Sequence, residues 1–319
     1  MIVLKFGGTS LESAEAIERM ESIVQSRLSR RPVVVVSALG KVTDNLLALG
    51  RETAAGQRQQ ALERFVWLRD YHYRVAATLI RQEDQDQLAE FLEQHFNELH
   101  LALDRIEEQQ AFTPQAQAEV ASFGERLSSR VVAMALRKSG MATVHLDTRS
   151  LIRTDDQHTQ ATPLLKESYA AIRVALGSVE ENTVPVVGGF IGSTAEGVTT
   201  VLGRNSSNLT AVLFAGAMGA EEVEIWTDVD GVFRQDPRQI ANQHAIDEMS
   251  FDEALEMANR GAKVFHPGAM ILARRENIPM WIKNSRRPEV RGTRVSSEVG
   301  VVRSAALGGF VGQRAAGSD

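Results

Sequence analysis

The sequence predicts an α/β fold, a three-layer αβα sandwich with a mainly parallel central sheet. Continuous apolar runs such as PVVVV at 32–36 lack the polar alternation of a half-exposed strand, and they are typical of parallel strands covered on both faces. Strand-like and helix-like segments also alternate along the chain. One strand, one helix and a second strand fit into about the first forty residues, the size of a βαβ unit.

The elements of this unit follow in order from the amino terminus. A strand at Ile2–Phe6 runs into the glycine pair Gly7-Gly8. A helix is expected next, because apolar residues recur on one face between Ala14 and Leu28. The second strand is the apolar run at 32–36, which ends in the small polar residue Ser37.

The middle of the chain is predicted to be helical from about Asp44 to Gly140, where Ala, Leu, Glu, Gln and Arg are abundant. Its only proline, Pro114, predicts a break between two helices. Strands are expected at 143–146, 184–187, 199–202, 222–226 and 278–282, with helices near 208–218 and 251–259. The segment from Arg303 to Asp319 is rich in Gly, Ala and Ser, which predicts a tail or linker.

The composition excludes several classes of protein. The 319 residues are 43% hydrophobic and 24% charged, which is ordinary for a globular chain that buries a large core. The formal charge of −6 gives no uniformly basic footprint for nucleic acid. The chain has no cysteine, which excludes disulfides, thiol nucleophiles and cysteine-ligated metal clusters.

The sequence also predicts where the protein resides. The opening residues MIVLKFGGTS do not fit a signal peptide, because the apolar part is too short and the charge follows it. No apolar run approaches the roughly 18 residues of a membrane span. We therefore expect a cytoplasmic protein whose partners are neither membranes nor nucleic acids.

Common nucleotide and metal motifs are missing. There is no GxxxxGK[ST] P-loop, no GxGxxG dinucleotide fingerprint and no HExxH. The segment Asp228-Val-Asp230-Gly231 is similar to the middle of a calcium loop, but Trp226 and Pro237 stand where carboxylates are needed. No metal site built from protein ligands is expected.

The segment Lys5-Phe-Gly-Gly-Thr-Ser10 places a lysine at the exit of a buried strand and two glycines at the start of a helix. Free backbone N–H groups, the positive end of a helix and the lysine together favour an anion such as phosphate. A tight strand-to-helix turn with a lysine reaching solvent fits these residues equally well. The local chemistry alone leaves both interpretations open.

A second polar loop, LGRNSSN at 202–208, again lies between a predicted strand and a predicted helix. Its serines and Asn208 are good helix N-caps, which is a purely structural account. Arg204 is harder to explain in that way. A planar guanidinium at the carboxyl end of a strand can bind a carboxylate or phosphate through two parallel hydrogen bonds.

Other segments also have both a structural and a functional interpretation. Residues 227–238 place acids, a turn and two arginines after an apolar strand, which also fits a plain acidic turn. Lys263 can contact a phosphate or face water, and His266 beside a proline is interpreted as a packing or capping residue. Glu125, in a segment expected to start or interrupt a helix, either complements the helix dipole or binds an ammonium group.

Taken together and in order, these motifs resemble the catalytic domain of aspartate kinases, of the amino acid kinase family, from Met1 to about Val295. The matching segments are KFGGTS at 5–10, VSA at 36–38 with Thr43, SFGERLS at 122–128, GFIG at 189–192, TVLGR at 200–204, IWTDVDG at 225–231, DPR at 236–238, GAKVFHP at 261–267 and Gly292-Thr293. The resemblance implies the amino acid kinase fold and transfer of the γ-phosphoryl group of ATP to the side-chain carboxylate of L-aspartate, a step in amino-acid biosynthesis.

The resemblance also assigns roles at the acceptor side. Lys5 contacts the phosphates, and Gly7 and Gly8 offer backbone N–H groups to the same oxygens. Since a carboxylate is already ionised at neutral pH, no general base is needed, and catalysis consists of in-line positioning and neutralisation of charge. The implied acceptor site holds Glu125 for the ammonium group, Arg204 for a carboxylate, Phe190 as a wall, and Ser37, Thr43 and Ser207.

At the donor side, the resemblance implies a nucleotide site in which Lys263 is the second cation on the phosphates. Phe233 stands where the family usually has tyrosine, so stacking is kept and a hydroxyl is lost. Mg²⁺ would accompany ATP, held largely by phosphates and water. The positions that match nucleotide-binding residues are Gly7, Gly8, Ser10, Thr227, Asp228, Phe233, Arg238, Lys263 and Val264.

One loop departs from the family pattern. The family has Gly-Arg-Gly-Gly-Ser-Asp, whereas this chain has Gly-Arg-Asn-Ser-Ser-Asn at 203–208. Asn205 and Ser206 add side chains where a backbone approaches the ligand and restrict positive φ. Asn208 replaces an acid that orients the catalytic lysines in related kinases. We therefore include Asn208 with Lys5 and Lys263 as a catalytic position, and expect Asn208→Asp to raise turnover.

A second departure concerns organisation. We expect an acceptor-binding lobe at 1–200, a nucleotide-binding lobe at 201–295, and a tail or linker at 296–319 in place of the ACT-type regulatory domains of aspartate kinases. Feedback by lysine or threonine through this chain is then not expected. The chain would act as a homo-oligomer or as part of a fused or two-subunit enzyme.

Two alternatives remain open at this point. One is a kinase of the same fold with another acceptor, although Glu125 with Arg204 favours an amino acid that carries an extra acid. The other is a non-catalytic subunit that binds a nucleotide or an amino acid. Asn208 favours it, whereas Lys5, Arg204, Asp228 and Lys263 weigh against it.

Overall fold

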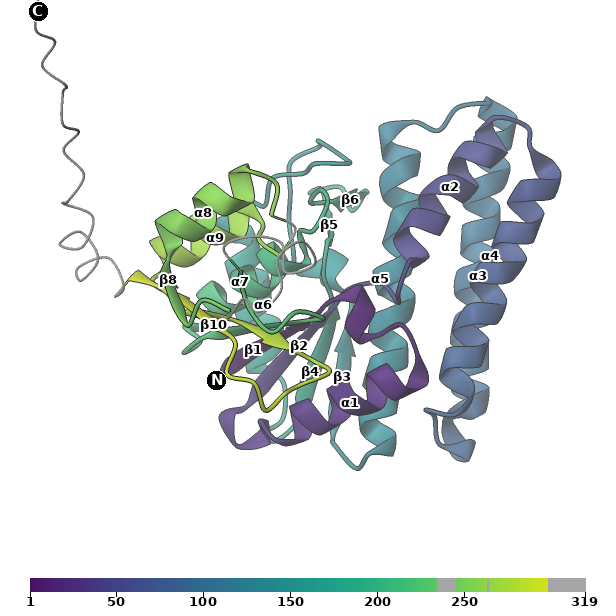
Figure 1. Cartoon of the computed structure of the whole chain (residues 1–319). Helices are drawn as coiled ribbons and strands as arrows, with labels where there is room; N and C mark the ends of the chain where they lie inside the picture. Colours follow the sequence, from purple (N-terminus) through teal and green to yellow (C-terminus); the bar gives the residue numbers. More distant parts are fainter. Residues whose placement is uncertain (234–244, 263, 298–319) are drawn as a thin grey trace, which may run out of the picture.

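An eight-stranded sheet organises the computed structural model, which describes residues 1–233, 245–262 and 264–297 (Figure 1). The strand order is β3-β4-β2-β1-β7-β9-β10-β8, and only β10 runs antiparallel to a neighbour, β9. The strands are β1 Ile2–Phe6, β2 Pro32–Val36, β3 Thr143–Leu146, β4 Val184–Gly188, β7 Val223–Thr227, β8 Glu248–Ser250, β9 Met280–Asn284 and β10 Thr293–Ser296.

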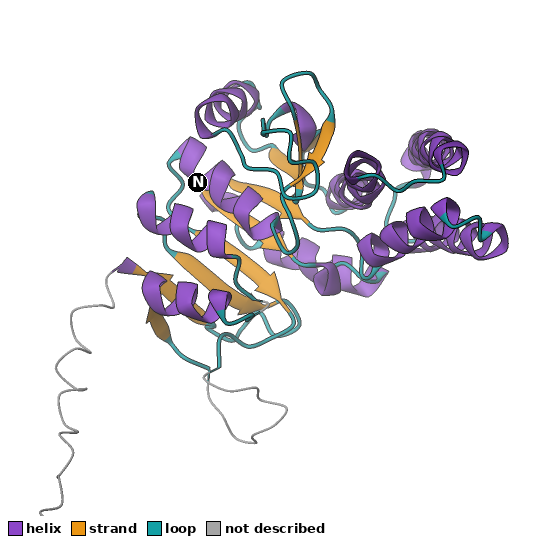
Figure 2. Cartoon of the chain, turned by 90° about the horizontal axis from the view of Figure 1, so that it is seen from above, coloured by secondary structure: helices purple, strands orange, loops and turns teal. Residues whose placement is uncertain are grey.

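Helices cover both faces of this sheet, which completes the predicted αβα sandwich (Figure 2). Helices α2 to α5 also extend beyond the sheet as a group of long helices (Figure 1). The helices are α1 Ala14–Gln25, α2 Val42–Ala54, α3 Arg58–Ala77, α4 Gln85–Gln109, α5 Pro114–Lys138, α6 Leu165–Gly177, α7 Ser207–Met218, α8 Phe251–Asn259 and α9 Pro267–Arg275.

Two apolar cores lie on the two sides of the sheet, and the period of two in β1 divides its side chains between them. Ile2, Leu4 and Phe6 join the core formed with helices α1 to α5. Val3 joins the core formed with helices α6 to α9. The valines of β2 are fully buried, as the absence of polar alternation predicted.

Most predicted elements are confirmed, with two corrections. The strand expected at 199–202 forms β6 (Thr199–Val201), but it pairs with β5 (Ile191–Ser193) in a separate two-stranded sheet. The segment Ser122–Glu125 neither starts nor interrupts a helix, because it lies in the middle of α5. That helix begins at Pro114, where Thr113 caps the N–H of Ala116. None of the helices described in the chain is long and apolar enough to cross a membrane.

Candidate functional site

A cavity of about 550 Å³ opens at the carboxyl ends of the central strands β1, β2 and β7. In open α/β sheets this is the edge at which ligands bind. It brings together residues that lie as far apart in sequence as Lys5 and Val264. The lining includes Lys5, Gly7, Gly8, Ser37, Thr43, Glu125, Phe190, Arg204, Ser207, Asn208, Thr227, Asp228 and Val264 from the predicted set.

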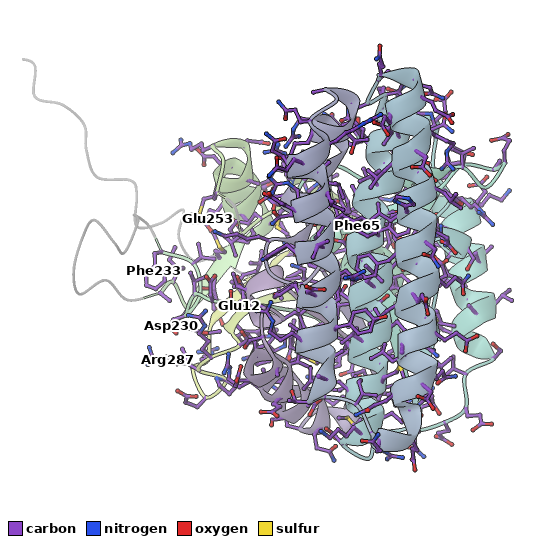
Figure 3. All side chains as sticks on the ribbon, turned by 90° about the vertical axis from the view of Figure 1, so that its right-hand side faces the viewer. Glu12, Phe65, Asp230, Phe233, Glu253 and Arg287 are labelled. Carbon is purple, nitrogen blue, oxygen red and sulfur yellow. The ribbon has the colours of Figure 1, made fainter. Side chains whose placement is uncertain are left out.

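Two predicted residues that the structure describes, Ser10 and Phe233, are not among those lining the cavity. Ser10 is buried beneath it, where its hydroxyl contacts the Ser285 hydroxyl at 2.8 Å. Phe233 is half-buried and lies on the side of the molecule that carries Asp230, away from the helices that carry Phe65 (Figure 3). Arg238 and Lys263 lie outside the described residues.

Lys5 and the two glycines after it form one wall of the cavity. Burial is the main cause that lowers the pKa of Lys5 to about 8, and the negative charge of Glu125 partly offsets it. The N–H of Gly7 donates to the carbonyl of Trp226 at 3.0 Å, so it is not free for a ligand as expected. The N–H of Gly8 donates to no described residue and remains available to an anion.

Gly8 is required by close packing and not by its backbone angles. A Cβ at Gly8 would lie 2.8 Å from the carbonyl oxygen of Gly40 and 3.1 Å from that of Ala38. The N–H of Gly40 also donates to the carbonyl of Gly8 at 3.1 Å. The loop after β1 is therefore held against the loop after β2, and both line the cavity.

Glu125 projects from the middle of α5 and is only 3% exposed. Its Oε1 accepts the N–H of Ala38 at 3.1 Å, while its buried Oε2 has no hydrogen-bond partner. Burial raises the pKa of Glu125 to about 8, against the opposing effects of the Ala38 N–H and Lys5. A buried carboxylate oxygen without a donor is costly, and a ligand that supplies a donor would remove that cost.

Phe190 adopts a left-handed backbone conformation with φ of 67°, which is rare for a bulky residue. Its N–H donates to the Thr210 hydroxyl at 3.0 Å, and its carbonyl accepts the N–H of Leu202 at 2.8 Å. The preceding Gly189 is packed closely, because a Cβ there would lie 2.5 Å from the Cβ of Ser207. These contacts hold the Phe190 ring at the cavity wall.

The loop at 203–208 contains a residue with a left-handed backbone conformation. Asn205 has φ of 60°, a conformation that asparagine tolerates better than most residues, so the side chain there does not straighten the loop. Ser206 occupies the N-cap position of α7 but its side chain makes no capping bond. Arg204 is exposed and forms no ion pair or hydrogen bond with any described residue.

Asn208 connects α7 to the loop before α9. Its Nδ2 donates to the carbonyl of Val264 at 3.0 Å, and its buried Oδ1 has no partner in the described part of the chain. Because only the amide nitrogen can donate to a carbonyl, this contact fixes the orientation of the amide. Next to it, Ser207 accepts a hydrogen bond from the Ser37 hydroxyl at 3.1 Å.

The remaining wall of the cavity follows β7. The Thr227 hydroxyl donates to Oδ1 of Asp228 at 3.2 Å, and the Thr227 carbonyl accepts the N–H of Ser285 at 2.8 Å. His266 caps α9, as expected, because its Nδ1 accepts the N–H of Ala269 at 3.3 Å. It does not line the cavity.

Several lining residues were missed by the sequence reasoning. Asp44 and Leu47 are the side chains among them that add charge or bulk, whereas Asn205, which also lines the cavity, was already expected near the ligand. Asp44 and Leu47 follow Thr43 on the first turns of α2, so an extension of that motif along the helix could have found them. Thr9, Ala38, Gly40 and Ile225 complete the set.

The described residues offer no protein cage for a magnesium ion. Within 1–233, 245–262 and 264–297 no three His, Asp or Glu side chains come together in a metal-binding cluster. Asp44 and Asp228 are carboxylates at the cavity, so an ion carried by a polyphosphate would meet acidic side chains at this edge. The residues present fit an ion that is held mainly by phosphate oxygens and water.

Comparison with known proteins assigns the chain to a family. The amino acid kinase family matches residues 1–284. Chloroplastic aspartokinase 2 of Arabidopsis thaliana is 35% identical over 298 residues, which are 91% of this chain and 53% of that protein. Lysine-sensitive aspartokinase 3 of Escherichia coli is 34% identical over 300 residues, 93% of this chain and 64% of that protein. The chain thus spans between half and two thirds of the length of these relatives.

The solved structures to which this chain is similar include aspartokinases, as do the curated proteins that its sequence matches. The chain is similar to E. coli aspartokinase III in complex with aspartate and ADP, with a TM-score of 0.87, 32% identity, and coverage of 94% of this chain and 65% of that one. Its similarity to Clostridium acetobutylicum aspartate kinase gives a TM-score of 0.75 at 25% identity, over 94% and 64% of the two chains. This chain belongs to the amino acid kinase family.

Proposed function

We propose that this chain transfers the γ-phosphoryl group of Mg-ATP to the side-chain carboxylate of L-aspartate, giving 4-phospho-L-aspartate and ADP. The observation that carries the proposal is the buried, unpartnered Oε2 of Glu125 in the same cavity as Arg204 and Lys5. These three groups suit the three charges of the reaction: an ammonium, a carboxylate and a phosphate.

The acceptor is recognised by its zwitterionic end. Glu125 accepts from the ammonium group of aspartate, which supplies the donor that Oε2 lacks. Arg204, which has no partner among the described residues, binds the α-carboxylate. Ser37, Thr43 and Ser207 supply hydroxyls along the same wall, and the fixed ring of Phe190 closes it. An amino acid with a second acid is therefore preferred to a simple carboxylate.

The chemical step needs no base. One oxygen of the aspartate side-chain carboxylate forms a bond to the γ-phosphorus, while the bond from that phosphorus to the oxygen of the ADP leaving group breaks. Both carboxylate and nucleotide are ionised at neutral pH, so no proton is transferred. Lys5, the N–H of Gly8 and Lys263 stabilise the charge on the transferred group. Asn208 fixes the loop at Val264, to which Lys263 is joined.

The nucleotide occupies the part of the cavity next to β7. Thr227, Asp228 and Val264 line it there, and Ser10 supports the glycine loop from below through Ser285. Phe233 and Arg238 are proposed to contact the nucleotide from the segment that follows. Mg²⁺ supplies neutralisation of the phosphates, with the acidic side chains of Asp44 and Asp228 at the same edge.

Two kinds of relative support this proposal. The E. coli aspartokinase III structure that this chain resembles holds aspartate and ADP. The matched curated relatives are named aspartokinases. We further propose that residues 1–200 form the acceptor lobe and 201–295 the nucleotide lobe, and that the chain acts as a homo-oligomer or as part of a larger enzyme.

The proposal is tested by trapping the acyl phosphate with hydroxylamine. Mg-ATP is supplied with L-aspartate, L-glutamate, succinate or N-acetyl-L-aspartate, and hydroxamate is measured. The expected result is hydroxamate with L-aspartate and little with succinate or N-acetyl-aspartate, which lack the ammonium group that Glu125 binds. Hydroxamate with another acceptor alone would contradict the choice of substrate. No hydroxamate with any acceptor, in a protein that still binds ATP, would point to a non-catalytic binding subunit.

A further inference from the structure

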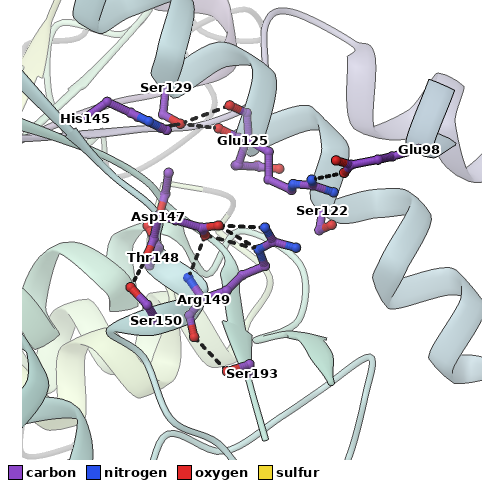
Figure 4. A network of polar contacts seen from close by, with 12 residues as sticks. Glu98, Ser122, Glu125, Ser129, His145, Asp147, Thr148, Arg149, Ser150 and Ser193 are labelled. Atoms are coloured by element: carbon purple, nitrogen blue, oxygen red, sulfur yellow. Dashed lines mark hydrogen bonds and ion pairs between the residues drawn. The ribbon is translucent and has the colours of Figure 1, made fainter. Parts of the chain in front are cut away.

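A second cavity, of about 240 Å³, lies between α4, α5 and the ends of β3 and β4. It shares no lining residue with the cavity described above. Figure 4 shows part of its wall, where Asp147, Thr148 and Arg149 from the turn after β3 meet Ser129 and His145. The proposed reaction uses none of these residues.

Two arginines face this cavity from different elements. Arg126 of α5 is only 8% exposed, and its side chain lies over the ring of Phe123 with 4.3 Å from Cζ to the ring centroid. One of its terminal nitrogens bonds Glu98, but its buried Nε has no partner. Arg149 is held by Asp147, with Nη2 at 2.6 Å from Oδ2. Both guanidinium groups are thereby fixed in direction.

The charges around the arginines are unequally placed. The side chains of Glu98 and Asp147 are 38% and 42% exposed, whereas those of Arg126 and Arg149 are 8% and 28% exposed. Positive charge therefore lies deeper than negative charge. Arg126 and Arg149 line the same cavity, and burial followed by the positive charge of Arg149 lowers the pKa of Arg126. The buried Arg126 with its unpartnered N–H, together with the partly exposed Arg149 on the same cavity, favours an anionic ligand.

The two histidines of the cavity add hydrogen-bonding groups but little charge. Burial lowers the pKa of His145 to about 4, and it also lowers the pKa of His95. Both rings are thus neutral at neutral pH. His145 Nε2 contacts the Ser129 hydroxyl at 2.9 Å, and His95 Nδ1 contacts the carbonyl of Phe91 at 2.9 Å. The cavity offers polar contacts around the arginines without further cations.

We propose that this cavity binds a small oxyanion, either a carboxylate or a phosphate, between Arg126 and Arg149. The anion accepts the N–H of Arg126 Nε, which no described residue accepts, and takes a second bond from the guanidinium of Arg149. A volume of about 240 Å³ suits inorganic phosphate or a short dicarboxylate and excludes a nucleotide.

The cavity is joined to the first site by two hydrogen bonds. The Ser129 hydroxyl donates to the carbonyl of Glu125 at 2.7 Å, and the Thr148 hydroxyl donates to the carbonyl of Gly188 at 2.6 Å. Gly188 is two residues before Phe190. A bound anion would thus steady the backbone beneath Glu125 and Phe190. This second part rests on the proposed function, and it predicts a change in the KM for the acceptor with little change in the KM for ATP.

Binding is tested by calorimetry on the full chain at constant ionic strength, with inorganic phosphate in one arm and succinate in the other, and methylammonium as the cationic control. Three variants assign the binding to a site. Arg149→Gln changes the second cavity, and Lys5→Gln changes the first cavity. Arg105→Gln is the control, because Arg105 of α4 lines neither cavity and pairs with Glu119 of α5. Arg149→Lys is a fourth variant, which keeps the charge and loses the planar fork.

We expect one of the two anions to bind the wild type, and the arm that gives heat identifies its class. Arg149→Gln should weaken binding at least about tenfold and Arg149→Lys by less, whereas Lys5→Gln and Arg105→Gln should leave it unchanged. Absence of binding by both anions, or binding that disappears in Lys5→Gln and persists in Arg149→Gln, would overturn the site. If the anion binds but the KM for aspartate is unmoved, the site stands and the coupling to the proposed reaction is wrong.

Discussion

At the scale of single residues, the proposed site depends on two ionisable groups, Glu125 and Lys5, whose pKa values burial shifts toward each other. Burial raises the pKa of Glu125 to about 8 and lowers the pKa of Lys5 to about 8. The charged forms are the ones that bind, because Glu125 needs its carboxylate for an ammonium group and Lys5 needs its proton for a phosphate. The protonation state of the empty site therefore changes within the ordinary working range of pH.

The two shifts give pH profiles of opposite sign. Below pH 8 Glu125 takes up a proton, so the affinity for L-aspartate should rise as the pH approaches 8. Above pH 8 Lys5 loses its proton, so the affinity for Mg-ADP should fall by up to about tenfold per pH unit. Calorimetric titrations from about pH 6 to 9.5 measure the affinity for each ligand, and this range extends to both sides of the two pKa values of about 8.

The matched variants for this pH test remove one titration each. Glu125→Gln should flatten the profile for aspartate and keep the profile for Mg-ADP. Lys5→Arg should do the reverse, because a guanidinium stays charged over the whole range. Profiles that are unchanged in the two variants would contradict the assignment of these groups.

Glu125→Gln should also raise the KM for L-aspartate by about 10- to 100-fold, because a charged hydrogen bond to the ammonium group is lost in a buried place. The KM for ATP should change little. Glu119→Gln is the control on the same helix, since that side chain is 38% exposed and pairs with Arg105. Equal effects of the two substitutions would show that Glu125 acts only through the stability of α5.

Asn208 separates a catalytic effect from a structural one. Asn208→Asp places a negative charge where the family pattern implied by the resemblance has one, so we expect kcat to rise. The same change removes the donor to the carbonyl of Val264, which should lower the free energy of unfolding by about 1–3 kcal/mol. Steady-state kinetics and thermal unfolding of the variant measure the two effects. An unchanged or lower kcat would count against a charge requirement, and unchanged stability would count against the contact with Val264.

At the scale of elements, α5 packs through a glycine against the loop after β2, next to the proposed acceptor site. A Cβ at Gly124 would lie 2.7 Å from the Cβ of Ala38, whose N–H binds Glu125. The Ser128 hydroxyl donates to the carbonyl of Ser37 at 2.8 Å, one turn further along the helix. One helix face therefore positions both Glu125 and the loop after β2.

Gly124→Ala should lower the free energy of unfolding by about 1–3 kcal/mol through overpacking, and it should raise the KM for aspartate, because the loop at Ala38 must move. Gly177→Ala is the matched control, since the space around that helical glycine is open. There alanine should stabilise the protein by about 0.4–1 kcal/mol. Urea unfolding compares the two variants, and similar stabilities would contradict the packing argument.

The sequence predicted these elements unequally, for physical reasons. Apolar runs identified the buried strands, because a short β-branched run such as PVVVV at 32–36, without polar alternation, is typical of a strand covered on both faces. The place of Glu125 within α5 was misjudged, because SFG at 122–124 contains a serine and a glycine that usually weaken a helix. Close packing against Ala38 requires a glycine at position 124. A contact between residues 86 positions apart leaves no local pattern in the sequence. The same holds for the donation by Gly7 to Trp226.

At the scale of the whole molecule, one continuous sheet brings site residues from before and after residue 200 to the same edge. The first four strands in the order, β3-β4-β2-β1, come before residue 200, and β7 to β10 come after it. The cavity lies where β1 meets β7, so residues from both parts of the chain line it. The fold class was predictable because strand-like and helix-like segments alternate along the chain. That β6 pairs with β5 and not with the main sheet depends on strand pairing, which hydrophobic periodicity does not encode.

Binding across this edge should stabilise the molecule as a whole. A non-hydrolysable ATP analogue with Mg²⁺ at 100 times its Kd should add about 2.7 kcal/mol and raise Tm by about 5 °C. Adding L-aspartate as well should give a further rise. Thermal unfolding of wild type and Lys5→Gln provides the comparison, and a nucleotide-dependent rise of equal size in Lys5→Gln would show that the nucleotide binds elsewhere.

If the chain phosphorylates the side chain of L-aspartate, the product trapped by hydroxylamine is aspartate 4-hydroxamate. Wild type and Lys5→Gln are incubated with Mg-ATP, L-aspartate and hydroxylamine, and the product is analysed by mass spectrometry. We predict ATP-dependent aspartate 4-hydroxamate with the wild type and a loss of at least about a hundredfold with Lys5→Gln. No 4-hydroxamate from the wild type, under conditions in which both ligands bind, would contradict the proposed reaction.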